Sequence, residues 1–429
     1  MVVSPLRFIH AADLHLGRQF SGLERTGPEL GRIFRHAHYE AWERIVRAAI
    51  DRKVDFVTLA GDLFDASSPG VRARVAYRDG VTRLHEAGIP VYAVLGNHDP
   101  LAVFPESLRN LPGQHLFGTD PRGIRPPQVE YSEGVEIFGA SFPTSVVREN
   151  LVTGFRRDPG VDLAIGLVHA NVAGIGGHRN YAPCTLDDLL RAGMDVWCLG
   201  HVHARMILSR NPLIFYPGAS QGAQINEAGP HGCDLVTVSD EGSVETEALP
   251  IAPVCWETID VDVSGFKSPD DIPDAVERES SRLGERDGAV QAVVVRINLR
   301  GRGEPEVAGG WEDNGEIQDI LSDRLSTLPV PVFPESVRNL TSPWPDPESL
   351  EEGDGFLADF LRLCSGTAAD PTALERVIGE VRRELLTKVS PRYLGPGLLP
   401  RGCTEDDGVW SDRLDNARKL VAKMFADSK

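Results

Sequence analysis

The sequence predicts an α/β fold in its first part, followed by a small α+β unit and a helical C-terminal region. Over the first 220 residues, short apolar runs typical of buried strands alternate with segments of helical periodicity. Most of these runs end at a polar group that contains Asp, Asn or His. The alternation indicates a largely parallel sheet, and the later strand-rich part indicates a second, mixed sheet. Near residue 250 the pattern changes to strand–helix–strand and then to helices.

The elements of the first part follow from these patterns in chain order. We expect strands at residues 6–12, 54–60, 89–95, 135–140, 162–168, 195–199 and 213–216. Helical patterns occupy residues 33–53, 67–87 and 185–192. Ser67-Ser68-Pro69-Gly70 is typical of a turn that starts a helix, and Gly88 is typical of a helix end.

The second part of the chain has a different composition and begins near Pro250. Strand patterns at residues 258–263 and 290–299 flank an acidic helical segment at 269–283. A short helix is expected at 317–325, and the proline-rich residues 342–347 are typical of a linker. Further helices are expected at 356–364, 371–386 and 410–425. These patterns predict three regions, at residues 1–250, 251–340 and 341–429.

The charge of the chain is strongly acidic and unevenly distributed. The 429 residues carry a net charge of −19. Residues 1–250 hold 23 Lys and Arg against 29 Asp and Glu, whereas residues 251–429 hold 21 against 34. This balance argues against a broad basic face for nucleic acid. A local site is still compatible with it, because bound divalent cations can dominate the field around them.

The cysteines, the first residues and the apolar runs indicate the cellular location to expect for the protein. None of the six cysteines forms a C-x-x-C pair, which argues against a zinc knuckle or a dithiol redox motif. The first residues lack the charged and apolar regions of a signal peptide, and no apolar run has the length needed to span a bilayer. We therefore expect a cytoplasmic protein without a membrane partner.

Candidate metal ligands lie at the ends of the expected strands or in the loops that follow them. In open α/β sheets, ligands bind outside the carboxyl ends of the strands. Gly96-Asn97-His98-Asp99, for example, directly follows the apolar run at residues 89–95. The full candidate set is Asp13, His15, Asp62, Asn97, His98, His169, His201 and His203.

The residue types in this set indicate the chemistry. Imidazole, carboxylate and amide oxygen suit first-row divalent metals such as manganese, iron or zinc, and the absence of thiolates is unlike a structural zinc site. Two metal ions about 3.5–4 Å apart can stabilise the attacking and leaving oxygens of a phosphoryl displacement. Such a site needs a bridging carboxylate and about three further ligands for each ion, a number that the candidate set supplies.

Each candidate taken alone has an ordinary structural explanation. A single histidine at a strand end is usually a satisfied polar residue, and Gly96-Asn97-His98-Asp99 could be a simple turn. His201 and His203 alternate and would face the same side of a regular strand, which is a weak indication of a metal site. Five strand-terminal groups in succession favour a metal site over these separate explanations.

At these residues the chain resembles the calcineurin-like metallophosphoesterases. The resemblance covers residues 6–240 and narrows to the double-strand-break-repair nuclease branch, which includes the SbcD and YhaO-like DNA repair exonucleases. The superfamily motifs are Asp13-x-His15, Gly61-Asp62-x-x-Asp65, Gly96-Asn97-His98-Asp99, His169 and Gly200-His201-x-His203. The branch motifs are His10-Ala11-Ala12-Asp13-Leu14-His15-Leu16-Gly17, Val168-His169-Ala170-Asn171 and Tyr216-Pro217-Gly218-Ala219.

The resemblance implies a metallophosphoesterase-type β-sandwich flanked by helices, and a role for each site residue. His98 would contact the scissile phosphate and protonate the leaving oxygen instead of binding metal. Asp65 stands where some members of the branch have a histidine. We expect Asp65 and Asp99 to lie beside the metal ligands, and we expect Asp65 to orient one of the histidine ligands. The two ions are expected to be Mn²⁺. One would be held by Asp13, His15 and His203, and the other by Asn97, His169 and His201. Asp62 would lie between the two ions.

The resemblance also implies an activity and partners. The expected activity is that of a metal-dependent DNA nuclease, and more narrowly an exonuclease in DNA repair. Two alternatives are an esterase for a small nucleotide or another phosphoester, and a metal-binding scaffold without catalysis. Related nucleases carry a small capping domain, which residues 251–340 would form, and then helices that bind an SMC-like coiled-coil ATPase. A homodimer through residues 33–53 or 67–87 is a further expectation.

Overall fold

The candidate site residues all belong to one compact unit of the chain. The computed structural model describes residues 5–20, 28–66, 68–126, 134–174, 181–266, 268–285, 290–303, 314–343, 350–370, 372–377, 379–380 and 417–418. The chain divides into two compact units. The first comprises Met1–Ile259, Val276–Ile297 and Ile317–Val337, and the second comprises Asp260–Ala275, Asn298–Glu316 and Arg338–Lys429.

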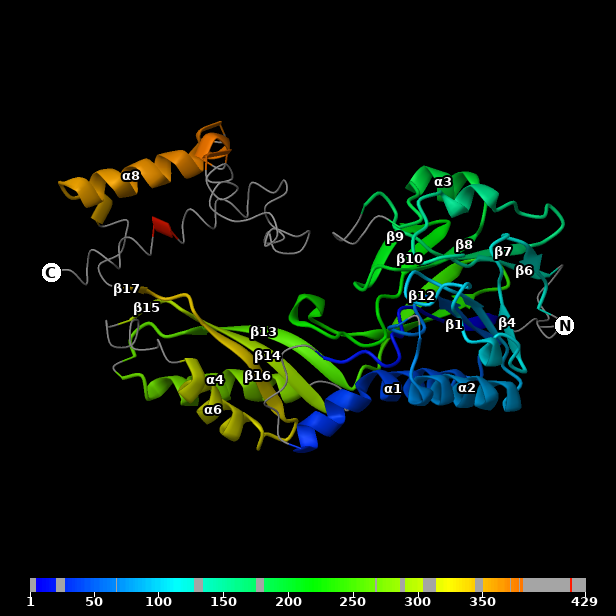
Figure 1. Ribbon diagram of the computed structural model, residues 1–429, viewed down its shortest axis with the longest axis horizontal. Helices are drawn as coiled ribbons and strands as arrows, with labels where there is room; N and C mark the ends of the chain where they lie inside the picture. The colour runs from blue at the N-terminus through cyan, green and yellow to red at the C-terminus, as the bar shows by residue number, and fades with distance from the viewer. Residues whose placement is uncertain are drawn as a thin grey trace. The chain divides into compact units, whose positions relative to one another are not determined.

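Two six-stranded sheets form the body of the first unit (Figure 1). The first sheet has the strand order β12-β11-β1-β2-β3-β4. Strands β1 to β4 run parallel, β11 runs antiparallel to β1, and β12 runs antiparallel to β11. The bounds are β1 (Leu6–Ala11), β2 (Phe56–Ala60), β3 (Val91–Val94), β4 (Gln114–Leu116), β11 (Gly232–Val238) and β12 (Val244–Pro250).

The second sheet is mixed, as the sequence predicts, and has the order β5-β6-β7-β8-β10-β9. Strands β6, β7, β8 and β10 run parallel, and the edge strands β5 and β9 run antiparallel to their neighbours. The bounds are β5 (Gly123–Ile124), β6 (Val135–Ala140), β7 (Leu163–His169), β8 (Val196–Gly200), β9 (Met206–Arg210) and β10 (Leu213–Tyr216). The predicted two-sheet α/β fold is confirmed.

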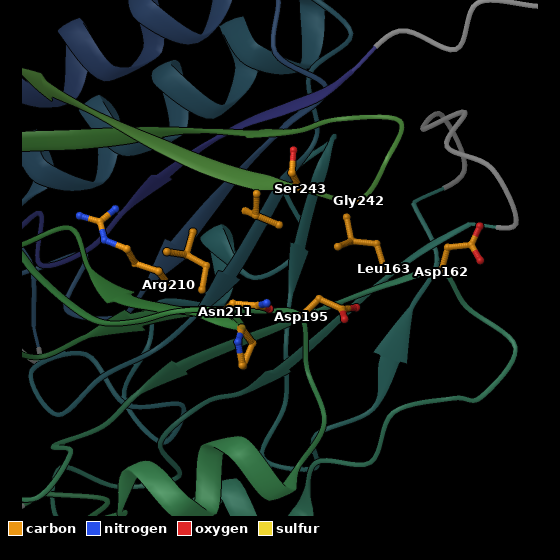
Figure 2. A pocket seen from close by; sticks show the side chains of 10 residues that line it. Asp162, Leu163, Asp195, Arg210, Asn211, Gly242 and Ser243 are labelled. Carbon is orange, nitrogen blue, oxygen red and sulfur yellow. The ribbon is translucent and has the colours of Figure 1, made fainter.

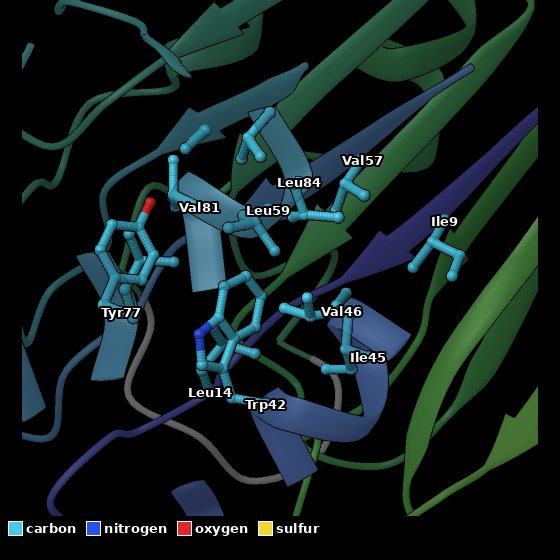
Figure 3. Close-up of a cluster of buried hydrophobic side chains, with 14 of the residues drawn as sticks. Ile9, Leu14, Trp42, Ile45, Val46, Val57, Leu59, Tyr77, Val81 and Leu84 are labelled. Carbon is cyan, nitrogen blue, oxygen red and sulfur yellow. The ribbon is translucent and has the colours of Figure 1, made fainter. Parts of the chain in front are cut away.

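Both faces of the first sheet are buried at β1, β2 and β3, which explains why these strands are continuous apolar runs. Helices α1 (Pro28–Asp51) and α2 (Val71–Glu86) cover its outer face. There Trp42 of α1 and Tyr77 of α2 pack with Ile9 and Leu59 of the sheet (Figure 3). Phe8, adjacent to Ile9 and on the opposite face, belongs to the core between the two sheets.

The core between the sheets combines aromatic and branched residues from both. Phe8 stacks on Phe56 with ring centroids 4.7 Å apart, and Ile165 and Phe215 of the second sheet pack in the same cluster. The outer face of the second sheet carries its own buried cluster, which includes Leu189 of α3 (Leu186–Arg191). Short 3-10 turns lie at Glu106–Leu108, Leu151–Gly154 and Ile225–Glu227.

The structure also contains elements beyond those predicted. Helix α1 begins at Pro28, five residues before the predicted start at residue 33. Strands β4, β5, β9, β11 and β12 were not predicted from the sequence. Strand β12 is a largely exposed edge strand in which Glu245, Thr246 and Glu247 interrupt the apolar residues, so it lacks the apolar run on which the prediction relied.

A three-stranded sheet of order β13-β14-β16 follows the first two sheets along the chain. Its strands are β13 (Val254–Asp262), β14 (Ala292–Arg300) and β16 (Val332–Asn339), and β16 was not predicted. Along the chain, helix α4 (Asp271–Ser281) and a 3-10 turn at Arg282–Glu285 lie between β13 and β14, and helix α6 (Asn314–Leu325) lies between β14 and β16. Within the first unit, Trp256 and Phe333 pack against Phe34 and Ala37 of α1.

The remaining described part contains a two-stranded sheet of β15 (Arg302–Gly303) and β17 (Ser342–Pro343), and helix α8 (Phe356–Ala369). Helix α8 includes the predicted segment 356–364. Residues 372–377 and 379–380 of the predicted helix at 371–386 are helical. The rest of that segment, and all of 410–425 except residues 417–418, lies outside the described residues. Among the described helices, none combines the length and the apolar character that crossing a bilayer requires.

Candidate metal centre

The structure brings all eight candidate ligands together at the carboxyl ends of strands from both sheets. Asp13 and His15 follow β1, Asp62 follows β2, and Asn97 and His98 follow β3. His169 is the last residue of β7, and His201 directly follows β8. Because parallel strands present their carboxyl ends at the same edge, residues up to 190 positions apart meet there.

The first group of ligands consists of Asp13, His15 and His203. The Nε2 atoms of His15 and His203 lie 3.2 Å apart. Oδ1 of Asp13 lies 4.0 Å from Nε2 of His15 and 3.9 Å from Nε2 of His203. These three atoms therefore surround one point that a cation could occupy.

The second group consists of Asn97, His169 and His201. Nε2 of His169 lies 3.2 Å from Oδ1 of Asn97 and 3.3 Å from Nδ1 of His201. Nδ1 of His169 donates a hydrogen bond to the carbonyl oxygen of Ala60, at 2.9 Å, so Nε2 is left with its lone pair. The second group therefore also presents electron-pair donors toward a common point.

Asp62 lies between the two groups. Its Oδ2 atom is 3.9 Å from Nε2 of His15 and 3.5 Å from Nε2 of His169. Its other oxygen, Oδ1, accepts a hydrogen bond of 2.9 Å from the backbone N–H of His98. Asp13 is arranged in the same way, since its Oδ2 accepts from the backbone N–H of His201 at 3.0 Å. Each carboxylate thus has one oxygen fixed by the backbone and the other directed into the centre.

The arrangement fits divalent metal ions. Metal–nitrogen bonds of about 2.0–2.1 Å place neighbouring ligand atoms about 3.0–3.4 Å apart. The pairs His15–His203, His169–Asn97 and His169–His201 have this spacing, whereas Oδ1 of Asp13 lies 3.9–4.0 Å from the two histidines of its group. Nε2 of His169 and Oδ1 of Asn97 are both acceptors, and two acceptors 3.2 Å apart repel unless a cation lies between them. Oδ1 of Asp13 is buried and has no hydrogen-bond partner among the described residues. A bound cation would satisfy it.

The electrostatics of Asp62 and His15 agree with this fit, whereas burial favours the neutral form of Asp13. Burial raises the pKa of Asp13, and the neighbouring Asp62 raises it further against the effect of nearby histidines. Burial also disfavours ionised Asp62, but the surrounding histidines, His169 foremost, hold the pKa of Asp62 below its ordinary value. Burial lowers the pKa of His15 well below its ordinary value. Neutral imidazoles beside a carboxylate are the protonation states that bind metal ions.

The backbone at the ligands adopts conformations that few residues tolerate. Asp13, His15, Asp62 and His201 have φ angles of 51°, 43°, 49° and 101°, in the region that favours glycine. Such strain is typical of functional sites, where the surrounding structure compensates for it. Gly200 is needed for a different reason, since a Cβ there would lie 1.8 Å from the carbonyl oxygen of Ala60.

His98 differs from the ligands in its exposure. Its side chain is 41% exposed, and Nε2 lies 4.0 Å from Oδ2 of Asp62. Nδ1 donates a hydrogen bond of 2.7 Å to the carbonyl oxygen of Asp65. The ring is thus fixed at one nitrogen and presents the other to solvent beside the centre, where it can contact a substrate.

Asp65 and Asp99 both lie beside the ligands, in different ways. Oδ1 of Asp65 is 3.5 Å from Nδ1 of His15. Asp99 is buried and accepts hydrogen bonds from the backbone N–H groups of Leu63, Phe64 and Gly96. Burial and the nearby Asp62 raise the pKa of Asp99 to about 7. Asp99 therefore joins the loop after β2 to the turn after β3.

Two charged residues beside the centre were not predicted from the sequence. Oε1 of Glu227 accepts a hydrogen bond of 2.9 Å from Nδ1 of His203. Arg18 donates to the same oxygen, at 3.4 Å, and its Nε lies 4.0 Å from Oδ1 of Asp65. Glu227 lies in an irregular loop 24 residues after His203 and belongs to no strand-end motif, so no sequence signal marked it.

The Glu227–His203 pair is a strong electrostatic interaction. Burial would lower the pKa of His203, but the hydrogen bond and charge of Glu227, together with Asp13, raise it. Burial likewise favours neutral Glu227, yet His203 and Arg18 hold its pKa well below the usual range. Glu227 is therefore ionised when it faces the ligand.

A separate hollow lies at the opposite ends of the strands. It has a volume of about 430 Å³ and opens between the starts of β7 and β10 and the turn before β12 (Figure 2). None of the candidate ligands lines it. The lining residues are Asp162, Leu163, Asp195, Arg210, Asn211, Pro212, Leu213, Gly242, Ser243 and Val244.

Comparison with known proteins gives two family matches. Residues 6–205 match the calcineurin-like phosphoesterase family, and residues 256–342 match the middle domain of the metallophosphoesterase YhaO. All the residues that surround the metal centre, apart from Glu227, lie within the first match. The resemblance inferred from the strand-end motifs is confirmed.

Among individual relatives, the chain is similar to the uncharacterized metallophosphoesterase YhaO of Bacillus subtilis. The two are 33% identical over 310 residues, which cover 70% of this chain and 73% of the relative. The DNA double-strand break repair protein Mre11 of Haloferax volcanii is 28% identical over 75% of this chain and 67% of its own length. Mre11 of Sulfurisphaera tokodaii is 26% identical over 48% of this chain and 51% of its own length.

Proposed function

The chain belongs to the calcineurin-like phosphoesterase family, and from this premise we propose that it is a two-metal DNA nuclease that hydrolyses phosphodiester bonds in DNA repair. Membership makes it a phosphoester hydrolase that binds divalent metal ions. The observation that carries the two-metal part of the proposal is the centre itself, in which one carboxylate oxygen of Asp62 lies between two groups of metal ligands.

We propose the following division of roles. Asp13, His15 and His203 would hold one ion, Asn97, His169 and His201 would hold the other, and Asp62 would be shared between them. When bound, the two ions, proposed to be Mn²⁺, supply Lewis acidity that stabilises the negative charge developing on the phosphate. Asp65 and Asp99 fix the loops that carry these ligands.

His98 serves as the general acid in this proposal. The hydrogen bond from its Nδ1 to the carbonyl oxygen of Asp65 fixes the plane of the ring. Its Nε2 is free to donate a proton to the leaving oxygen, because the ring is 41% exposed on the open side of the centre. An imidazole suits this step because its ordinary pKa lies near neutral pH.

A local group of basic residues supports DNA as the substrate in spite of the acidic composition. Arg72 of α2 lies over the ring of Tyr39, 4.8 Å from its centroid, and contacts His36 of α1. Arg32 and Arg35 act on the same histidine electrostatically, and these arginines are exposed. The hydroxyl of Tyr39 lies near Gly17, only two residues after His15, so the basic group borders the centre. The DNA repair function in the names of the Mre11 relatives also favours this substrate.

The proposed partners rest on exposed apolar surface. Phe356 and Leu363 of α8 are 69% and 68% exposed, and we propose that residues 341–429 bind an SMC-like coiled-coil ATPase. Val71 of α2 is 67% exposed, which supports a homodimer through the segment 67–87. We also propose that residues 251–340 form a capping domain beside the nuclease domain of residues 1–250.

The test is Mn²⁺-dependent hydrolysis by the purified protein of linear duplex DNA, single-stranded DNA and bis-p-nitrophenyl phosphate. The nuclease proposal requires DNA cleavage that disappears in His98→Ala. Cleavage of the small ester alone would favour a nucleotide esterase instead. Binding of two ions without hydrolysis of any of the three substrates would favour a scaffold.

A further inference from the structure

Glu227 makes a dense set of contacts for a loop residue. Its side chain is 7% exposed and lies in the 3-10 turn Ile225–Glu227. Oε1 accepts hydrogen bonds from His203 Nδ1 at 2.9 Å and from the side chain of Gln224 at 3.0 Å. Oε2 accepts from the backbone N–H of Ala223 at 2.7 Å. The carboxylate is therefore held from both sides and cannot rotate away from His203.

The bond to Glu227 determines which nitrogen of His203 is free. A carboxylate accepts only, so Nδ1 carries the proton, and in the neutral ring Nε2 keeps its lone pair toward Asp13 and His15. A negative charge on the far side of the ring also makes Nε2 a stronger electron-pair donor. Glu227 thus controls both the orientation of the His203 ring and the donor strength of its Nε2 atom.

Arg18 extends this control to the second histidine of the same group. It contacts Glu227 at 3.4 Å and Asp65 at 4.0 Å, and Asp65 lies 3.5 Å from Nδ1 of His15. We refer to Asp65, Arg18 and Glu227 as the Arg18 cluster. The guanidinium offsets the repulsion between the two carboxylates that lie behind the two histidines.

The other group of ligands is supported differently. His169 donates its Nδ1 proton to the carbonyl oxygen of Ala60, a neutral acceptor within the sheet. A neutral carbonyl fixes the ring but adds no negative charge behind it. The two metal positions therefore differ, since full charges support the position of His15 and His203, whereas the backbone orients His169.

The loop that carries Glu227 is fixed by the first strand of the following region. Nε1 of Trp256 donates to the carbonyl oxygen of Gly222 at 2.8 Å, and the backbone N–H of Gly229 donates to the carbonyl oxygen of Trp256 at 2.9 Å. Ile225 packs in the same buried cluster as Trp256. Trp256 thus anchors the loop on both sides of Glu227.

We propose that Glu227 is a positioning residue that sets the metal affinity of the Asp13, His15 and His203 position, with Arg18 holding its charge in place and Trp256 holding its loop. This inference rests on the proposed two-metal function. It assigns control of the metal affinity at this position to residues outside the ligand set.

The test compares Mn²⁺ uptake by wild-type protein and by Glu227→Ala, Glu227→Gln and Glu245→Gln. Each full-length protein is dialysed against graded Mn²⁺, and the bound metal is counted by mass spectrometry. Electron paramagnetic resonance distinguishes a coupled Mn²⁺ pair from a single ion. Glu245→Gln is the matched control, because Glu245 is exposed on β12 and the variant makes the same change in charge.

Wild-type protein and Glu245→Gln should bind two ions with the signal of a coupled pair. Glu227→Ala should bind one ion with unchanged affinity and the other about 10–100-fold more weakly. At Mn²⁺ concentrations between the two dissociation constants, its electron paramagnetic resonance spectrum should be that of a single ion. Glu227→Gln should fall between them, because its amide oxygen can accept from Nδ1 of His203 but carries no charge. This graded rescue is not expected if Glu227 only stabilises the fold.

Two results would overturn this inference and leave the proposed two-metal function intact. One is unchanged binding of both ions by Glu227→Ala, and the other is equal weakening of both. If Glu227→Ala fails to fold, the isosteric Glu227→Gln decides by the same criteria. Failure of the wild-type protein to bind two ions would instead overturn the proposed function together with the inference.

Discussion

Nδ1 of His169 donates a hydrogen bond of 2.9 Å to the carbonyl oxygen of Ala60. The two residues end strands of different sheets, β7 and β2, so this bond crosses the interface between the sheets directly beneath the metal centre. It fixes the tautomer of His169 and the distance between the two sheets at the same time. The metal centre therefore depends on the close approach of the sheets as well as on the ligands.

Gly200→Ala should disrupt this approach. A Cβ at Gly200 would lie 1.8 Å from the carbonyl oxygen of Ala60 and 3.0 Å from Nδ1 of His169, so the sheets would have to move apart. Overpacking against backbone should lower the free energy of unfolding by about 3 kcal/mol or more and weaken metal uptake. Urea unfolding and metal analysis measure both effects. Gly118→Ala, which adds a methyl group with no neighbour within 4 Å, should change neither.

His98→Ala should separate metal binding from hydrolysis. The variant retains the backbone N–H that donates to Oδ1 of Asp62, so both ions should bind as before. Hydrolysis should fall about 100-fold or more, because general acid–base groups contribute about 10²–10⁴ to the rate. The measurements are Mn²⁺ stoichiometry and initial rates on DNA, with His85→Ala as the control. Full activity of His98→Ala would exclude its role as the acid.

Asp62→Ala and Asp13→Ala should differ in the number of ions that they lose. Oδ2 of Asp62 faces both groups of ligands, so its removal should abolish high-affinity binding of both ions. Oδ1 of Asp13 lies nearest His15 and His203, so its removal should weaken mainly the position of that group. Mass-spectrometric counting of bound metal distinguishes these outcomes. Retention of one tightly bound ion by Asp62→Ala would contradict the bridging position.

Acid should destabilise the protein through His10. Burial lowers the pKa of His10 to about 4, from an ordinary value of 6.5. Above pH 6.5 both folded and unfolded states hold the ring neutral, so His10 contributes no pH dependence. Between pH 6.5 and 4 only the unfolded state binds the proton, and unfolding becomes easier by up to about 1.4 kcal/mol for each pH unit.

The measurement for His10 is urea unfolding with EDTA at pH 7.5, 6.0 and 5.0. His10→Gln retains an N–H group that can donate to the carbonyl oxygen of Leu199, as Nε2 of His10 does at 3.1 Å, but it does not titrate. The variant should therefore lose less stability on acidification than the wild-type protein. Equal losses in the two proteins would show that the pKa of His10 is not lowered in the folded state.

Arg72→Glu should weaken DNA binding without affecting metal binding. Loss of one phosphate contact should reduce the slope of log affinity against log salt concentration by about 1. The comparison uses fluorescence anisotropy of a labelled duplex in EDTA at several salt concentrations. Arg122→Glu makes the same charge change at an exposed residue paired with Asp120 and serves as the control. Equal effects of the two variants would indicate a general charge effect instead of a contact at Arg72.

The strand-end motifs made the ligand set predictable. A buried parallel strand is a continuous apolar run, and a ligand placed just after it, such as Asp13 or Asn97, is marked by the abrupt change in polarity. His98 and Asp99 were identified in the same way. The edge strand β12 was missed because it carries no such apolar run.

The charged residues behind the ligands were not predictable in this way. Arg18 and Glu227 are 209 positions apart, and each lies in a loop without periodic pattern. Their contact exists only because the loop after β1 and the loop before β11 are brought to the same edge of the structure. A pattern in the sequence indicates local backbone preference and burial. It does not indicate which irregular loops will contact each other in the folded protein.

The sequence by itself determined seven of the twelve strands in the two large sheets and the residues able to bind metal, because these properties depend on neighbouring positions. The tertiary structure decided which ligands share an ion, which carboxylate lies between the groups, and which charge supports each histidine. Those relationships depend on the packing of two sheets against each other. His203 illustrates both levels, since its place in a strand-end motif was visible in the chain, but its pairing with Glu227 required the folded protein.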